Sequence, residues 1–293
     1  MKNLRKYKKY INIGSYCHFD EVEEFVSLTE NKVSCFTFCV KSCYYLFAKR
    51  NDRKEKRKLF LNRMFEKYNK NVFFPHAGFV NNFAHLDEKK RNIFVKGFLT
   101  EIDLCKFYSL ENIIIHAGSN VKKDFSPLYC SIIEILSKTE NFSLVLENSC
   151  GAGSQILSDI SKYKDIFFFL SDKVENGRLL ICLDTAHLIA ASYDINEKDV
   201  FLNIMKSITF KKFSTLIIHL NDTDCFIGER KDRHRKLFSK YITVDFLKFF
   251  FRTILYYIEQ KFFKSVNIIC ETPLGIEDRA LELKKLYEIL FFL

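Results

Sequence analysis

Histidine and carboxylate residues stand where short apolar segments end, at many places along this chain. His76 follows NVFFP, His116 follows NIII and Glu147 follows FSLVL. A lone histidine after an apolar run is usually a core or loop residue, but this recurrence is not explained that way. The full set of such groups, including two from a loop, is His76, His116, Glu147, Asp184, His187, His219, Asp232, His234 and Glu271. These ligand types favour zinc over harder cations, so the set predicts a site for several metal ions, in a metallohydrolase or a metallo-isomerase.

The elements that must position these groups form an alternating pattern. Continuous apolar segments are typical of strands covered on both faces, and stretches with helical spacing lie between most of them. The expected strands are residues 11–17, 33–40, 71–77, 112–118, 143–149, 179–185, 215–222 and 266–272, and the clearest helices are 88–110, 244–262 and 279–293. This alternation predicts an α/β fold, a (β/α)8 TIM barrel with the metal site at the C-terminal face of its strands.

The organisation of the 293 residues favours a single barrel domain over residues 1–293, because no linker rich in proline, glycine or serine divides them. Residues 1–10 are basic and are expected to be a solvated tail, and residues 48–70 are expected to form a basic helix. No apolar run is long enough to span a bilayer, so we expect no membrane partner.

The net charge indicates what kind of partner the protein binds, and the cysteine content indicates its cellular compartment. The formal net charge is +10, which makes a polyanionic partner plausible without proving it. The 10 cysteines lie mostly within apolar segments and lack paired CxxC spacing. Buried free thiols predict an intracellular, reducing compartment, whether nucleus or cytoplasm.

Six segments resemble the endonuclease IV family of abasic-site (AP) endonucleases. They are FPHAGFVNN, IIIHAGS, LVLENSCGAGS, CLDTAHLIAASYDI, IHLNDTDCFIGERKDRH and ICETP, and the motifs DTAH and DRH are the most specific. The resemblance implies a TIM barrel with three zinc ions that acts as a monomer on double-stranded DNA in base excision repair. It further implies hydrolysis of the phosphodiester 5′ to an abasic site by a metal-bridging hydroxide, which leaves a 3′-hydroxyl, and removal of blocked 3′ ends.

Matching positions imply a role for each candidate residue. The implied ligand groups are His76, His116 and Glu147 for the first zinc; Glu147, Asp184, His219 and Glu271 for the second; and His187, Asp232 and His234 for the third. Glu147, Asp184 and Glu271 are also the implied catalytic residues, since they assemble the pair of ions that activates water.

The expected DNA contacts come from loops around the site: Phe79, Asn82, Arg230, Arg233 and Lys41, with Lys49 and Arg50 beside Lys41. Phe79 stands where the family usually has an intercalating tyrosine, so it is either an aromatic wedge or a core residue. Arg230 and Arg233 flank a ligand motif and could contact phosphate or support a ligand carboxylate.

The sequence also departs from the family, and two other functions remain open. Tyr16 stands near the position of a family histidine, and HAGS replaces the usual HPGS. The alternatives are a metal-dependent sugar isomerase or epimerase on a related barrel, and a non-catalytic, zinc-stabilised DNA-binding protein. Three complete ligand groups favour the nuclease, because the sugar enzymes have no use for a third metal.

Overall fold

Eight parallel strands form one sheet that curls into a barrel. The computed structural model describes residues 4–19, 21–30, 32–47 and 53–293. The strands are β1 (Ile11–Tyr16), β2 (Cys35–Phe38), β3 (Phe73–Pro75), β4 (Asn112–His116), β5 (Ser143–Glu147), β6 (Leu179–Asp184), β7 (Phe213–His219) and β8 (Phe263–Cys270). Their order in the sheet is β3-β2-β1-β8-β7-β6-β5-β4. All eight expected strands are therefore present, and the predicted TIM barrel is confirmed.

The barrel closes weakly between β3 and β4, the two ends of this order. Among the described residues, an isolated parallel bridge joins His76 to Ile114. Ala77 donates its backbone N–H to the Ile114 carbonyl over 2.9 Å, and the Asn112 side chain donates to the Phe73 carbonyl over 3.2 Å. This seam therefore has fewer backbone hydrogen bonds than the ladders elsewhere in the sheet.

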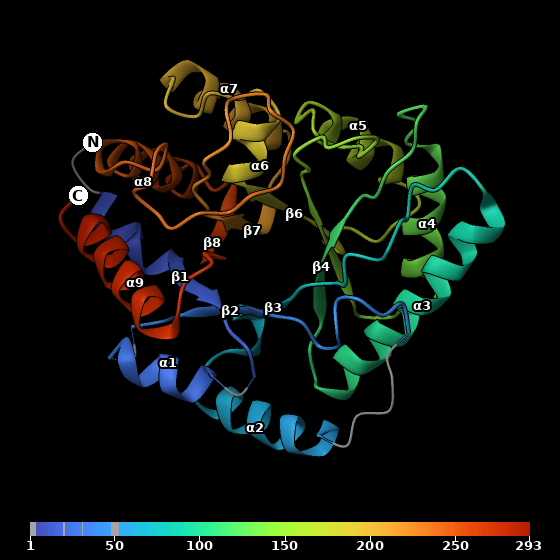
Figure 1. The fold of residues 1–293 in the computed structure, drawn as a ribbon, viewed down its shortest axis with the longest axis horizontal. Helices are drawn as coiled ribbons and strands as arrows, with labels where there is room; N and C mark the ends of the chain where they lie inside the picture. The colour runs from blue at the N-terminus through green and yellow to red at the C-terminus, as the bar shows by residue number, and fades with distance from the viewer. Residues whose placement is uncertain (1–3, 20, 31, 48–52) are drawn as a thin grey trace.

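Helices surround the strands, as Figure 1 shows. They are α1 (Val22–Leu28), α2 (Lys54–Lys67), α3 (Glu88–Phe107), α4 (Ser126–Ser137), α5 (Lys162–Leu170), α6 (Thr185–Ala190), α7 (Lys198–Ile208), α8 (Val244–Glu259) and α9 (Ile276–Phe291), with short 3-10 helices η1 (Leu4–Tyr10) and η2 (Lys70–Val72). The three clearest predicted helices are α3, α8 and α9, and the basic segment contains α2. Within the described ranges, no helix has the length and apolar character needed to cross a membrane.

The start of the chain differs from the expected tail. Residues 4–10 form η1, which packs against α8. Tyr7 is half-buried against the core, and Lys8 donates from Nζ to the Phe291 carbonyl over 2.6 Å. An aromatic residue among the lysines supplies the apolar surface that holds this segment to the barrel, which the basic composition alone concealed.

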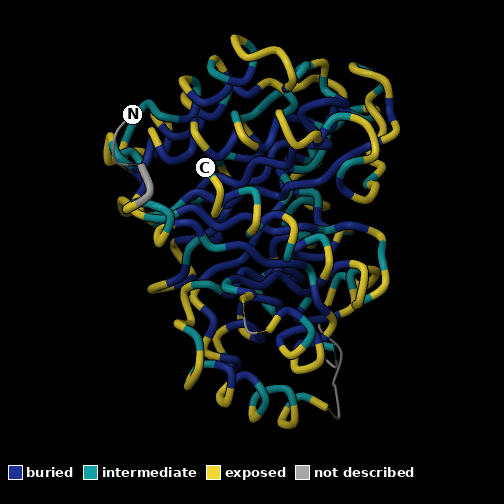
Figure 2. Tube along the Cα trace, turned by 90° about the vertical axis from the view of Figure 1, so that its left-hand side faces the viewer, coloured by how far each residue is buried: buried dark blue, intermediate teal, exposed yellow. Residues whose placement is uncertain are grey.

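Buried residues lie in the middle of the molecule and exposed residues lie mainly at its periphery, as Figure 2 shows. Every residue of β6 is buried, and the other strands are buried over most of their length. Side chains thus fill the barrel and also cover its outer face, which explains the continuous apolar runs in the sequence.

A close backbone approach between β1 and β2 yields a test of the barrel. Gly14 pairs with Cys35, and a β-carbon at Gly14 would lie 1.7 Å from the Cys35 carbonyl oxygen. We expect Gly14→Ala to lower the free energy of unfolding by about 3 kcal/mol, because backbone atoms cannot move aside as a side chain can. Gly275→Ala, where nothing lies within 4 Å of the new carbon, should cost less than about 1 kcal/mol. Urea unfolding measures both, and equal midpoints for the two variants would contradict this packing.

Candidate metal centre

All nine candidate ligands lie at one face of the barrel. His116, Glu147, Asp184 and His219 are the last residues of their strands, and His76 and Glu271 directly follow β3 and β8. The other three come from α6 and from the loop between β7 and α8: His187, Asp232 and His234. The carboxyl ends of parallel strands meet at one face, so ligands far apart in the sequence become neighbours.

Glu147 is the centre of this cluster and is 1% exposed. Its Oε2 lies 2.9 Å from His76 Nε2 and 3.6 Å from His116 Nε2. Its Oε1 lies 2.8 Å from Nδ1 of His219, which in turn lies 3.2 Å from Glu271 Oε2. The two carboxylate oxygens therefore face two different ligand groups, as a bridging carboxylate must.

A third group lies next to the first two. His187 Nε2 lies 3.3 Å from Asp232 Oδ1, and His234 Nε2 lies 3.4 Å from the same oxygen. His234 Nε2 also lies 3.5 Å from Asp184 Oδ2. Asp184 thus stands between the second group and the third, and Glu147 touches the third through His187 Nδ1 at 3.8 Å.

The hydrogen bonds of the imidazoles fit metal ligation. Nδ1 of His76 lies 2.9 Å from the Ala77 carbonyl oxygen, and Nδ1 of His187 lies 2.9 Å from that of Asn148. An Nδ1–H that donates to a carbonyl leaves the Nε2 lone pair directed at the cluster. The buried Nε2 atom of His234 has no hydrogen-bond partner in the described chain, and Nε2 of His187 faces the Asp232 carboxylate at 3.3 Å. Imidazole nitrogens beside convergent carboxylates are what a zinc ion would bind.

The cluster favours positive charge. Burial alone would lower the pKa of His76, but the hydrogen bond and charge of Glu147 raise it to about 10. Burial tends to raise the pKa of Asp232, but the hydrogen bond and charge of His187 lower it to about 2. Burial likewise opposes ionisation of Glu147, yet the neighbouring histidines hold its pKa well below its usual range. Glu147 and Asp232 therefore stay ionised, so protons or metal cations must balance their charge.

Two asparagines that the sequence reasoning missed hold the ligands in place. The side-chain oxygen of Asn148 accepts the backbone N–H of Asp184 over 2.7 Å, and its backbone carbonyl oxygen accepts a hydrogen bond from His187 Nδ1. Asn221 donates to Asp184 Oδ2 over 2.6 Å and accepts the backbone N–H of Glu271 over 2.8 Å. Each stands one or two residues after a ligand, and that position was the available signal.

Asp184 and Asp222 organise the backbone around the third group. Asp184 caps α6 by accepting the backbone N–H of His187 over 2.8 Å, which places that imidazole one turn into the helix. Asp222 is fully buried and accepts backbone N–H groups from residues 239–242 over 2.9–3.3 Å. The loop that carries Asp232 and His234 is thereby held at its far end.

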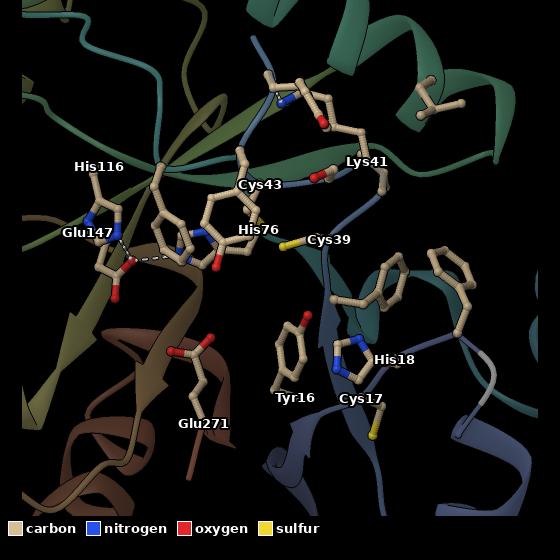
Figure 3. A pocket seen from close by; sticks show the side chains of 18 of the residues that line it. Tyr16, Cys17, His18, Cys39, Lys41, Cys43, His76, His116, Glu147 and Glu271 are labelled. Atoms are coloured by element: carbon tan, nitrogen blue, oxygen red, sulfur yellow. Dashed lines mark hydrogen bonds and ion pairs between the residues drawn. The ribbon is translucent and has the colours of Figure 1, made fainter. Parts of the chain in front are cut away.

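A cavity of about 1110 Å³ opens above the cluster. Figure 3 shows Glu147, His76 and His116 on one side of it and Tyr16 with His18 across from them. Glu271 projects into the space between these groups. Ligands from all three groups line the cavity, so a substrate of nucleotide size can reach them.

Three of the expected DNA-contacting residues are exposed, and one of them lines this cavity. Phe79 is 66% exposed and lines the cavity beside His76, which excludes the alternative that it belongs to the core. Arg230 and Arg233 are exposed, and no ion pair involves either one in the described part of the chain. Phosphate contact stays a prediction for both.

Two others form hydrogen bonds or an ion pair within the protein, and their contacts with DNA stay a prediction. Lys41 is 8% exposed, its Nζ lies 3.2 Å from Glu101 Oε2, and it donates to the Tyr45 carbonyl over 2.7 Å. Asn82 accepts the Ser119 N–H over 2.9 Å and so joins the loops after β3 and β4. Both side chains therefore brace loops at the site, and Lys41 also lines the cavity. Lys49 and Arg50 lie outside the described residues.

The chain is similar to a known protein family and to several named proteins. A family model described as a xylose isomerase-like TIM barrel matches residues 35–288. The chain is 31% identical over 243 residues to apurinic-apyrimidinic endonuclease 1 of Plasmodium falciparum, covering 77% of this chain and 38% of that protein. It is 31% identical to probable endonuclease 4 of Mycoplasma mobile, covering 68% and 67%.

The chain thus spans less than half the length of the Plasmodium relative. Among solved structures, endonuclease IV from Thermus thermophilus superposes with a TM-score of 0.76 at 19% identity, covering 96% of this chain and 100% of that one. At this identity the superposition supports the fold only.

The bracing role of Asn221 leads to a prediction about metal affinity. We expect Asn221→Ala to weaken zinc binding by about 10–100-fold, because Asp184 and the Glu271 backbone lose a shared partner. Asn203→Ala, at an exposed position on α7, should leave the affinity unchanged. Competition with a coloured chelator measures both. Equal affinities for the two variants, with both folded by circular dichroism, would rule out this role.

Proposed function

The chain belongs to the xylose isomerase-like TIM barrel family and, within it, to the endonuclease IV family of AP endonucleases, and on this premise we propose that it is a zinc-dependent AP endonuclease. It would cut the phosphodiester 5′ to an abasic site in double-stranded DNA, leave a 3′-hydroxyl, and also trim blocked 3′ ends. The observation that carries the proposal is the buried Glu147, whose two oxygens face two ligand groups while a third group lies within reach.

Three zinc ions fit the three groups. His76, His116 and Glu147 would hold the first ion. Glu147, Asp184, His219 and Glu271 would hold the second, since their ligand atoms lie within 4.8 Å of one another. His187, Asp232 and His234 would hold the third, with Asp184 close by. When bound, the ions would lower the pKa of the attacking water and stabilise charge on the phosphate oxygens.

The protein's own groups would prepare this chemistry. Glu147 fixes the spacing of the first two groups, because it is buried and held from both sides. Asn148 and Asn221 orient the ligand carboxylate of Asp184 before substrate arrives, so no reorganisation is needed during reaction. The third group, intact here, would stabilise the leaving 3′ oxygen, a task that sugar isomerases and epimerases do not have.

Recognition of the lesion would use the exposed residues at the cavity rim. Phe79 can insert into the minor groove as an apolar wedge, and an abasic nucleotide costs little to remove from the stack because it lacks a base to unstack. Arg230 and Arg233 can contact phosphates on the same side of the cavity. The formal charge of +10 favours such a polyanion.

The decisive test is incision of a duplex that bears one synthetic abasic site. Zinc-loaded protein should contain about three zinc ions, nick the strand 5′ to the site and leave an end that a polymerase extends. Removal of zinc by a chelator should stop incision, and added zinc should restore it. Absence of nicking together with turnover of a free sugar would support the isomerase, and DNA binding without nicking would support the non-catalytic protein.

The matched variant for this test is Glu147→Gln. It should lower the incision rate by at least about 1,000-fold, because the amide cannot supply the bridging charge. Glu140→Gln, an equally conservative change at an exposed position, should retain the full rate. Undiminished incision by Glu147→Gln would refute the mechanism.

The two free arginines should contribute to DNA affinity through phosphate contacts. Arg230→Ala and Arg233→Ala should each weaken binding and reduce the slope of log affinity against log salt by about 1. Arg252→Ala, exposed on α8, should leave both quantities unchanged. Fluorescence anisotropy at several salt concentrations measures the slope, and unchanged slopes in both rim variants would remove them from the interface.

A further inference from the structure

Two thiols face each other on the wall of the cavity, and nothing in the proposed reaction uses them. Cys39 directly follows β2 and Cys43 lies four residues later, and both are half-buried. A hydrogen bond links the two thiols, and Cys39 also contacts the Tyr16 hydroxyl. Figure 3 shows Cys39 and Cys43 between the loop of Lys41 and the metal-facing His76.

We propose that Cys39 and Cys43 are a redox site, which peroxide converts to an intramolecular disulfide and a dithiol reductant reopens. The other cysteines are poorly placed to compete. Cys35 is buried, with Sγ lying 3.5 Å from the Ile268 carbonyl oxygen of β8, and Cys130 is exposed on α4, on the outside of the barrel.

The chemistry begins at Cys43. The hydrogen bond from Cys39 lowers the pKa of Cys43, whereas the pKa of Cys39 is raised, so Cys43 is the thiol expected to react first. The thiolate attacks one peroxide oxygen, the O–O bond breaks, and sulfenic acid and hydroxide form. The Cys39 sulfur then displaces the sulfenic oxygen, its proton leaves with that oxygen as water, and the S–S bond forms. Peroxide accepts the two electrons.

The placement of the two thiols favours this bond. A disulfide needs sulfurs about 2.05 Å apart and α-carbons about 4.4–6.8 Å apart. The two thiols are hydrogen-bonded to each other, and the chain bends at residues 40 and 41, between the two cysteines. Their half-buried position on a cavity wall also allows a small oxidant to reach them.

Oxidation should reach the DNA-facing rim through Gly78. A β-carbon at Gly78 would lie 3.0 Å from the Cys43 carbonyl oxygen, so the backbones of the two loops pack directly together. Gly78 lies between His76 and Phe79 in sequence, and Tyr44, beside Cys43, is 81% exposed. Drawing Cys43 toward Cys39 would therefore shift this contact and weaken DNA binding. This consequence rests on the proposed function, whereas formation of the disulfide does not.

Peptide mapping tests the redox site on the zinc-loaded protein. The protein is treated with hydrogen peroxide, alkylated with iodoacetamide and cut with trypsin, which cleaves after Lys32, Lys41 and Lys49 and so separates the two cysteines. We expect the peptides 33–41 and 42–49 to be linked, fragmentation to locate the bond at Cys39, and dithiothreitol to release it. Cys39→Ser and Cys43→Ser should each abolish the link. Unlinked peptides at a dose that already oxidises the exposed Cys130, or a link through Cys35, would overturn the proposal.

Binding to an abasic duplex tests the consequence. Oxidised protein should bind on the order of tenfold more weakly than reduced protein, reversibly, and Cys39→Ser should lose this response to peroxide. A disulfide that forms without changing affinity would overturn the link to DNA recognition. If reduced protein itself neither binds nor nicks the duplex, the proposed function fails, while the mapped bond still decides the redox site.

Discussion

A single buried carboxylate sets the arrangement of the whole catalytic face. Glu147 ends β5, is 1% exposed and stays ionised, although burying an unpaired carboxylate costs several kcal/mol. His76 after β3 and His219 at the end of β7 contact its two oxygens at 2.9 and 2.8 Å. Strands on either side of β5 must therefore end at the same level, and the barrel is the architecture that meets this requirement.

The same constraint explains which parts of the molecule could be predicted from the sequence. The strands were predictable because both of their faces are buried, and the ligands were predictable because barrel chemistry occurs where strands end. The positions of Lys41 and Asn82 were not, because a loop residue near a site can face either the solvent or its own protein. Lys41 forms a buried ion pair with Glu101, which lies 60 positions later in the sequence and in another element.

The roles of Asn148 and Asn221 could be predicted only in part. Asn148 and Asn221 follow ligands in the segments LEN and HLND, so their positions were visible, but their partners were not. Asn221 binds both Asp184 and the backbone of Glu271, and only the folded barrel brings these three strand ends together. Asp222, the next residue, holds residues 239–242, so one short motif orients a ligand carboxylate and anchors a rim loop. Hydrogen bonds of these three residues thus determine the interior of the site.

The first ligand group lies across the junction between β3 and β4, where the barrel has few backbone hydrogen bonds. His76 and His116 stand on opposite sides of this seam, and Glu147 Oε2 lies between them at 2.9 and 3.6 Å. The isolated bridge at the seam involves His76 itself. An ion bound by these three side chains would cross-link β3 and β4 at the junction where the barrel closes weakly. Loss of that ion would therefore remove a cross-link from the barrel as well as a metal of the proposed reaction, so the stability of the protein and its proposed chemistry would depend on the same ion.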